Sequence, residues 1–182
     1  MYLRRRSCIL EMCASIAGAS IRYSGLVHFR IYEPADFEAL YAIEESCFEP
    51  PLRFPRRYMR QLLTSHRTAA WLAEEERGLA GFAIVEWLKA ADGSVAYIET
   101  IEVSAEFRGR GVGSELLCRI EGSARAAGAR SIWLHVDARN LSAIRLYEAR
   151  SYRQEGREEN FYGPHCPALV YSKALEQGLS DD

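Results

Sequence analysis

The sequence predicts a single mixed α/β domain in which about four helices flank a mostly antiparallel central sheet of about seven strands. Two observations lead to this fold class. Strand-like and helix-like segments follow one another in the order β-α-α-β-β-β-α-β-α-β-β along 182 residues. Short turns join the three middle strands, which makes those strands antiparallel, and a helix between the fourth and fifth strands makes one central parallel pair.

The regular pattern extends over residues 28–176, which we expect to form the domain. Residues 1–27 are expected to be a poorly ordered extension, and residues 177–182 a short tail. The basic and then apolar residues at the start resemble a secretion signal. However, Glu11 interrupts an apolar run that is too short and too weak to span a membrane.

Charge and cysteine content limit the partners of the chain. A formal net charge of −2 gives no general reason to expect nucleic-acid binding. The five cysteines are odd in number and widely spaced, so neither a zinc site nor a disulfide framework is predicted. Reduced thiols fit a cytoplasmic location. We expect no metal, no nucleic acid and no membrane among the partners, and either a monomer or a homodimer.

Alternating apolar residues predict the strands of the first half of the chain, and apolar residues three or four positions apart predict its helices. Pro34 opens the first helix, and Pro50 and Pro51 follow its end. The Asp92-Gly93 pair predicts a hairpin turn. The expected elements are a strand at 27–31, helices over 34–48 and 56–64, and strands at 68–74, 79–88 and 94–103.

An amphipathic helix opens the second half. Its apolar stripe runs from Val112 to Ala127, and Gly128 supplies the C-terminal stop. A strand at 131–136 follows. Asn140 then caps a helix that carries Tyr147 on its inner face. Two final strands are expected at 152–161 and 168–174.

The turn before the amphipathic helix is the most informative segment of the chain. Residues 108–114 read Arg-Gly-Arg-Gly-Val-Gly-Ser and lie directly between a strand and a helix. Glycines let the backbone approach a ligand closely, and the start of the helix directs N–H groups and the positive end of its dipole at that ligand. Because two arginines add positive charge, the sequence predicts a site for a phosphate-bearing cofactor.

Three kinds of phosphate site compete for this turn. A nucleotide P-loop requires a lysine, which the turn lacks. A dinucleotide fingerprint nearly matches Gly109, Gly111 and Ser114, and Asp137 stands near the place of the ribose-binding acid. Too little chain follows, however, to build the remaining strands and helices of a dinucleotide fold. Coenzyme A is the third candidate.

Two elements of the sequence resemble the GNAT superfamily of acetyltransferases. The acyl-CoA signature of that superfamily, R/Q-x-x-G-x-G/A, is satisfied from Arg108 to Gly113, and the segment from Asn140 to Tyr147 resembles its N-x-x-A-x-x-L-Y helix. The resemblance covers about residues 28–176. It implies the GNAT fold, in which the central parallel strands splay apart, and acetyl-CoA as the cofactor of an acyltransferase. One departure is Ser151, where relatives have a glycine; in a left-handed conformation serine costs about 1 kcal/mol.

The resemblance also implies specific contacts with acetyl-CoA. Backbone groups of the strand before the glycine turn would pair with the pantetheine arm, which Asn140 would reach from the next helix. Backbone N–H groups of the turn would hold the pyrophosphate. The predicted cofactor-binding residues are Ile101, Glu102, Val103, Arg108, Gly109, Arg110, Gly111, Val112, Gly113, Ser114, Asn140 and Tyr147.

Acetyl transfer from a thioester to an amine needs a base for the amine and an acid for the leaving thiolate. The resemblance implies Tyr147 as the acid, because a phenol with an ordinary pKa of about 10 stays protonated at neutral pH. Many relatives carry a strand glutamate where this chain has His135. The chain resembles instead a branch in which a strand histidine acts with a tyrosine of the preceding strand, here Tyr97. Glu99 and Glu102 are alternative bases through a water, and packing in the core is the alternative role of Tyr147 and His135.

Two further segments resemble the acceptor site of N-terminal acetyltransferases of the ribosomal-protein-alanine type. Phe48 and Pro51 belong to a segment like the loop that floors their peptide site. Residues 160–162 resemble their Asn-Tyr-Tyr element, although Phe161 replaces the first tyrosine and removes one hydroxyl contact. Phe48, Pro51 and Tyr162 are therefore the predicted substrate-binding residues.

The expected function is N-acetylation of the N-terminal α-amine of a protein or peptide. An α-amino group has a pKa of about 7.7–8.0 against about 10.4 for lysine, so its neutral form is far more abundant at neutral pH. The alternatives are a small-molecule amine such as a polyamine as acceptor, and a non-catalytic acyl-CoA-binding sensor. The acidic residues Glu155, Glu158 and Glu159 are interpreted as a solvated face, although they could attract a cationic amine.

Overall fold

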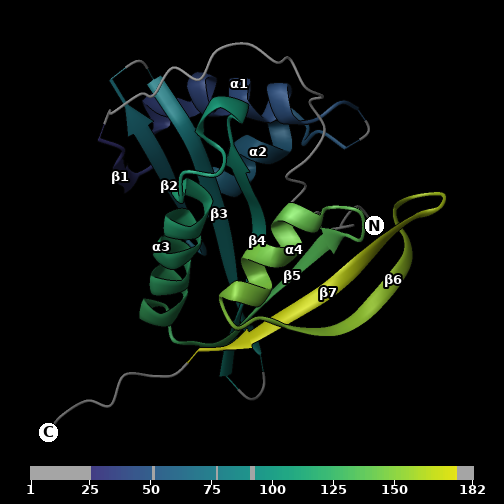
Figure 1. Cartoon of the computed structure of the whole chain (residues 1–182). Helices are drawn as coiled ribbons and strands as arrows, with labels where there is room; N and C mark the ends of the chain where they lie inside the picture. The colour runs from purple at the N-terminus through teal and green to yellow at the C-terminus, as the bar shows by residue number, and fades with distance from the viewer. Residues whose placement is uncertain (1–25, 51, 77, 91–92, 176–182) are drawn as a thin grey trace, which may run out of the picture.

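The computed structural model describes residues 26–50, 52–76, 78–90 and 93–175. Within them, seven strands form one sheet that four α-helices and two short 3-10 helices accompany (Figure 1). The strands are β1 (His28–Ile31), β2 (Thr68–Glu75), β3 (Gly78–Ala90), β4 (Gly93–Val103), β5 (Ala129–Asp137), β6 (Arg153–Gly163) and β7 (Cys166–Ala174). The helices are α1 (Phe37–Cys47), α2 (Arg56–Leu63), α3 (Val112–Ala126) and α4 (Leu141–Ala149), with 3-10 helices η1 (Pro34–Asp36) and η2 (Ala105–Phe107).

The strands lie in the order β1-β2-β3-β4-β5-β7-β6. β4 and β5 pair in parallel, and the other neighbours in this order pair antiparallel. The predicted fold class, a mostly antiparallel mixed sheet with a central parallel pair and flanking helices, is thereby confirmed. β7 lies between β5 and β6, an arrangement that local periodicity does not encode.

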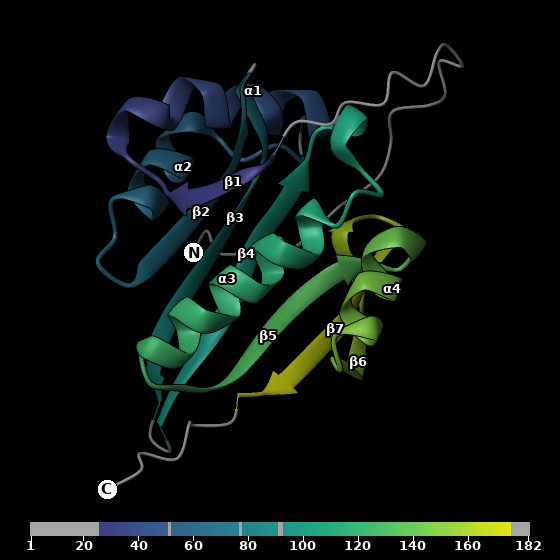
Figure 2. The ribbon, with the colours of Figure 1, turned by 60° about the vertical axis from the view of Figure 1, so that its left-hand side comes forward.

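The helices cover both faces of the sheet (Figure 2). α3 and α4 lie on one face, where Leu116 and Tyr147 belong to the same core cluster as Ile132 of β5. α1 and α2 lie on the opposite face, where Leu40 belongs to a second cluster with Phe82 of β3. Because successive strand residues point to opposite faces, β2 and β3 contribute to both clusters: Ala73 and Ala83 belong to the first, and Leu72 and Phe82 to the second.

A β-bulge in β4 changes which side chains face which layer. The ladder between β3 and β4 passes from Ile98 directly to Thr100, so Glu99 is the extra residue of the bulge. Ile98 before the bulge and both Ile101 and Val103 after it belong to the cluster on the α3 face. The bulge therefore moves this face from even-numbered to odd-numbered residues.

β4 and β5 stop pairing shortly before the bulge. The last residues that they pair are Tyr97 and Trp133, whereas β4 continues to Val103 and β5 to Asp137. Beyond Tyr97, the margin of β4 on the β5 side therefore faces a gap between two diverging strands. This is the splayed parallel pair that the sequence analysis predicted.

Most predicted elements are present with shifted ends. The strand predicted at 131–136 begins earlier, at Ala129, and η2 was not predicted. The stop at Gly128 has the left-handed conformation expected of a helix end, with φ of 78°. Residues 1–25, Asp92 and 176–182 lie outside the described residues, so the terminal extension, the tail and the Asp92-Gly93 turn stay predictions. No helix in the described ranges is both long and apolar enough to cross a bilayer.

Candidate active site

The glycine turn reaches the start of α3 through two left-handed residues. Gly109 has φ of 73° and Gly111 has φ of 83°, a conformation that a Cβ disfavours by about 1–2 kcal/mol. Gly111 is the N-cap residue of α3, and its carbonyl accepts the Glu115 N–H at 3.0 Å. The first N–H groups of α3 therefore remain at the turn, where the helix dipole is positive.

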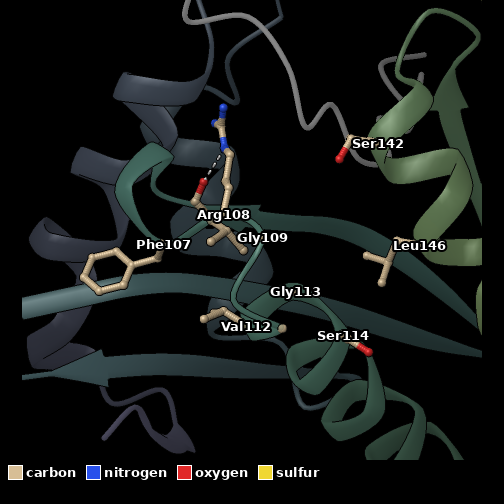
Figure 3. A pocket seen from close by; sticks show the side chains of 10 residues that line it. Phe107, Arg108, Gly109, Val112, Gly113, Ser114, Ser142 and Leu146 are labelled. Carbon is tan, nitrogen blue, oxygen red and sulfur yellow. Dashed lines mark hydrogen bonds between the residues drawn. The ribbon is translucent and has the colours of Figure 1, made fainter. Parts of the chain in front are cut away.

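A cavity of about 220 Å³ lies at this turn, between the start of α3 and the outer surface of α4 (Figure 3). Ser142 and Leu146 of α4 form its opposite wall. Among the predicted cofactor-binding residues, the cavity is lined by Val103, Arg108, Gly109, Gly111, Val112, Gly113 and Ser114. A cavity with such N–H groups at one wall suits the phosphates of an extended ligand.

The two arginines of the turn make different contacts. Arg108 donates from Nε to the Val103 carbonyl at 3.0 Å, a bond drawn in Figure 3, and its Nη2 lies 4.0 Å from Cys47 Sγ. Arg108 thus fastens the turn to the end of β4 and to α1. Arg110 is exposed, with its guanidinium 5.4 Å from the centre of the Phe107 ring.

The two residues predicted from the α4 pattern have structural contacts of their own. Asn140 accepts the Ala143 N–H at 3.1 Å through Oδ1 and so caps α4. Tyr147 is fully buried, with ring centres 5.5 Å from Tyr152 and 6.4 Å from Tyr171. The cavity is lined by the neighbouring Leu146, and Tyr147 itself does not belong to its lining.

On the opposite face of the sheet, three side chains from three strands form one hydrogen-bonded chain. Tyr97 Oη of β4 lies 2.8 Å from His135 Nδ1 of β5, and His135 Nε2 lies 3.1 Å from Glu158 Oε1 of β6. Phe161 stacks on the imidazole at 4.2 Å between ring centres and 6° between planes. The structure therefore brings the predicted Tyr97 and His135 together at the point where β4 and β5 separate.

Of the predicted acceptor residues, Tyr162 lies beside the Phe161 ring that covers His135. Tyr162 is buried and packs edge-on against Phe161, with 4.9 Å between ring centres. Phe48 follows the last residue of α1 and is also buried, and its carbonyl accepts Arg53 Nε at 3.0 Å. Pro51 lies outside the described residues.

A pair of buried carboxyl groups joins α1 to β4. The side chains of Glu44 and Glu102 are buried next to each other. Glu44 also accepts the Phe54 N–H at 2.6 Å, and Glu102 accepts the Thr100 hydroxyl at 2.8 Å. Burial and then the neighbouring Glu44 raise the pKa of Glu102 well above its usual range.

The sequence analysis missed two of these acids. Glu158 is exposed, in agreement with a solvated face, but its contact with His135 was not predicted. Glu44 was not singled out, yet it interrupts the apolar positions of α1, where Leu40, Tyr41 and Ile43 are buried. A charged residue on an apolar helix face is the signal that could have identified Glu44. No comparable local signal identifies Glu158, because its partner comes from another strand.

A family model described as "Acetyltransferase (GNAT) family" matches residues 37–152. Among curated proteins, histone acetyltransferase MCC1 of Arabidopsis thaliana is 24% identical over 172 residues, which cover 82% of this chain and 69% of that protein. Acetyltransferase ECA0875 of Pectobacterium atrosepticum is 29% identical over 127 residues, which cover 69% of this chain and 87% of that protein.

Solved structures share the fold. Arabidopsis thaliana NAA60 in complex with acetyl-CoA has a TM-score of 0.74 and 24% identity, and the match covers 82% of this chain and 99% of that one. The ribosomal-protein-S18-alanine N-acetyltransferase from Escherichia coli has a TM-score of 0.73 and 21% identity, with 86% and 99% covered. These likenesses support the arrangement of the sheet and of the helices around the gap.

Proposed function

The chain belongs to the GNAT acetyltransferase family, and we propose that it transfers an acetyl group from acetyl-CoA to the N-terminal α-amine of a protein or peptide. Family membership supports the acetyltransferase class. The observation that carries the acceptor proposal is the Tyr97–His135 hydrogen bond of 2.8 Å at the gap between β4 and β5. It supplies a base on the face of the sheet opposite to the cofactor cavity.

The residues of the donor side fit a pyrophosphate and an extended arm. Left-handed Gly109 and Gly111 leave open space where a Cβ would project, and the N–H groups at the start of α3 would hold the pyrophosphate. The margin of β4 from Ile101 to Val103 would pair with the pantetheine amides. Bound acetyl-CoA would supply an acetyl group activated as a thioester.

On the acceptor side, Tyr97 and His135 would remove the proton of the attacking amine. An α-ammonium group gives up its proton near pH 8, more than two pH units below a lysine side chain, so a histidine-based pair suits it better. Such proton transfer typically contributes about 10²–10⁴-fold to the rate. Phe48, Pro51 and Tyr162 would contact the first residues of the peptide.

Tyr147 would protonate the leaving thiolate. Its support is the match of the α4 segment to the family pattern and its place beside Leu146, which lines the cavity. The buried phenol is held among aromatic rings, which limits its movement.

The test of the acceptor is a thiol-release assay with matched substrates. We expect turnover with short peptides that have a free α-amine, and none with the same peptides blocked by N-acetylation while keeping an internal lysine. Turnover with spermidine alone would replace the peptide by a small amine as acceptor. Binding of acetyl-CoA without turnover on any amine would indicate a sensor.

His135→Ala tests the base. Turnover is expected to fall by roughly 10²–10⁴-fold while the affinity for acetyl-CoA stays unchanged, because the imidazole lies outside the cavity lining. His66→Ala is the matched control, since His66 is an exposed histidine before β2. Full turnover by His135→Ala would remove the imidazole from the mechanism.

A further inference from the structure

We propose that Glu158 is a positioning residue that holds His135 in the tautomer protonated on Nε2, so that the proton of the acceptor amine leaves through Tyr97. The inference rests on the proposed function, because it concerns the same base. It adds a third member to that base and fixes the order in which the three groups act.

When His135 is neutral, its two hydrogen bonds allow one arrangement of protons. An ionised carboxylate only accepts hydrogen bonds, so the 3.1 Å contact with Glu158 Oε1 requires a proton on His135 Nε2. A neutral imidazole has one donor and one acceptor, which leaves Nδ1 as the acceptor. The 2.8 Å contact is then donated by the Tyr97 hydroxyl to Nδ1.

This arrangement directs the proton. Because Nδ1 is occupied by the Tyr97 hydroxyl, the amine meets the Tyr97 oxygen rather than the imidazole. As one proton passes from the ammonium nitrogen to Tyr97 Oη, the original hydroxyl proton passes to His135 Nδ1. Tyr97 ends unchanged, the amine becomes neutral, and the positive charge rests on an imidazolium that faces the Glu158 carboxylate. A carboxylate beside an imidazolium stabilises it.

Glu158 is the acidic group that contacts the His135 imidazole among the described residues. Val170 of β7 lies opposite His135 in the ladder, and the Phe161 ring covers one face of the imidazole. On β6, the guanidinium of Arg157 donates to Glu159 at 2.6 Å. The titratable partners of His135 among the described residues are therefore Tyr97 from β4 and Glu158 from β6.

The exposure of the His135 and Glu158 side chains sets how strongly Glu158 influences His135. The side chain of His135 is 15% exposed and that of Glu158 is 55% exposed. A half-exposed carboxylate interacts weakly, by an amount that changes a rate constant roughly two- to fivefold. Glu158 also belongs to the strand that leads into Phe161 and Tyr162, so movement of the acceptor hairpin would change the contact.

Glu158→Gln tests the proposal through the pH profile. The carboxylate no longer stabilises the imidazolium in this variant, so the acidic limb of kcat/KM should move to lower pH. The plateau should fall roughly two- to fivefold because the base is weaker. Glu155→Gln is the matched control. Its carboxylate lies on the same strand but accepts the Ser172 hydroxyl, so its profile should follow the wild type.

A second measurement does not depend on turnover. Histidine-labelled full-length protein contains four histidines, and ¹⁵N NMR distinguishes a protonated from an unprotonated ring nitrogen. We expect the neutral His135 of the wild type to carry its proton on Nε2, and its titration midpoint to fall in Glu158→Gln by the same shift as the kinetic limb. A proton on Nδ1 in the wild type, or identical profiles for Glu158→Gln and wild type, would overturn the proposal.

The two readouts separate this inference from the proposed function. If peptides are not acetylated but NMR shows the Nε2 tautomer and its dependence on Glu158, the function fails and the positioning role stands. If peptides are acetylated and Glu158→Gln leaves both readouts unchanged, the positioning role fails and the function stands.

Discussion

Two residues with left-handed backbone adjoin the helices α3 and α4. Gly111 begins α3 with φ of 83°, and Ser151 follows α4 with φ of 66°. The left-handed conformation of Ser151 agrees with the expectation for this position, where the family resemblance implies a glycine. Glycine adopts the left-handed region without a Cβ penalty, whereas serine does not.

Ser151→Gly is expected to stabilise the protein by up to about 1 kcal/mol, because it removes the left-handed penalty while adding some freedom to the unfolded chain. Urea unfolding measures the change. Ala149→Gly is the control at an exposed position in the last turn of α4, where glycine costs about 1 kcal/mol. A loss of stability in both variants would contradict the assignment of strain to Ser151.

Gly111→Ala is expected to have the opposite effect, with a loss of about 1–2 kcal/mol from backbone strain. Its methyl group would also project beside the cavity, so the dissociation constant for acetyl-CoA, measured by calorimetry, should rise. Gly122→Ala lies within the same helix in open space and should gain about 1 kcal/mol without a change in affinity. Equal affinity in all three proteins would remove the turn from the binding site.

At the scale of single residues, the sequence anticipated a contact where residues carry a recognisable pattern. Tyr97 and His135 were paired from the family pattern, and their side chains hydrogen-bond. Glu158 could not be added, because its contact depends on the register of β6 against β7, and that ladder shifts between Glu158 and Gly163. Whether these residues act in catalysis stays a proposal for the experiments above.

Among the elements, the carboxyl pair between α1 and β4 connects the two sides of the site. Glu44 on α1 accepts the N–H of Phe54, in the segment between α1 and α2. Glu102 lies on the part of β4 that borders the gap. Three other ionisable groups surround the pair: Cys47 interacts with Glu102, Tyr41 with Glu44, and Arg108 contacts the Cys47 sulfur.

The raised pKa of Glu102 predicts how stability depends on pH. The folded protein holds this proton more tightly than the unfolded chain, in which the usual pKa is 4.5. The resulting stability is complete below that pKa and is lost as pH rises through the higher pKa of the folded state. Each unit of pKa difference corresponds to about 1.4 kcal/mol.

Glu102→Gln is therefore expected to flatten the decline of stability above about pH 5, because it replaces the titrating group with a neutral amide of the same shape. Urea unfolding at a series of pH values measures the slope. Glu106→Gln serves as the control, since Glu106 is exposed in η2. A wild-type slope in Glu102→Gln would show that this carboxyl group does not hold an extra proton.

The sequence predicted the elements better than their arrangement. Strands and helices followed from periods of two and of three to four residues, and Gly128 and Asn140 marked helix ends correctly. The bulge at Glu99 was not predicted. A bulge is defined by the pairing of β4 with β3, and the sequence of β4 alone does not contain that pairing. The place of β7 between β5 and β6 depends on pairing between distant segments, which local periodicity does not contain.

At the scale of the whole molecule, the sheet separates the proposed cofactor cavity from the proposed base. The cavity lies on the side of α3 and α4, whereas alternation in β5 turns His135 away from Leu134 and Val136, which face those helices. The gap between β4 and β5 joins the two sides. Stabilisation by a ligand in the cavity should therefore not depend on substitutions at the proposed base.

Saturating acetyl-CoA tests this separation. A ligand that binds only the folded state at about 100 times its dissociation constant stabilises it by about 2.7 kcal/mol. We expect that shift in thermal melting for the wild type and for His135→Ala alike, and a smaller one for Gly111→Ala at the same ligand concentration. A shift that disappears in His135→Ala would mean that the two sides are not independent.

The gap between β4 and β5 also has a consequence for the order of events during turnover. With the proposed substrates arriving from opposite faces, neither blocks the path of the other, and an acetylated product can depart while coenzyme A stays bound. Access alone then imposes no compulsory sequence of binding and release. Any sequence found in steady-state kinetics would have to be transmitted across the sheet. The Glu44–Glu102 contact is one described connection from the acceptor segment to the edge of the gap.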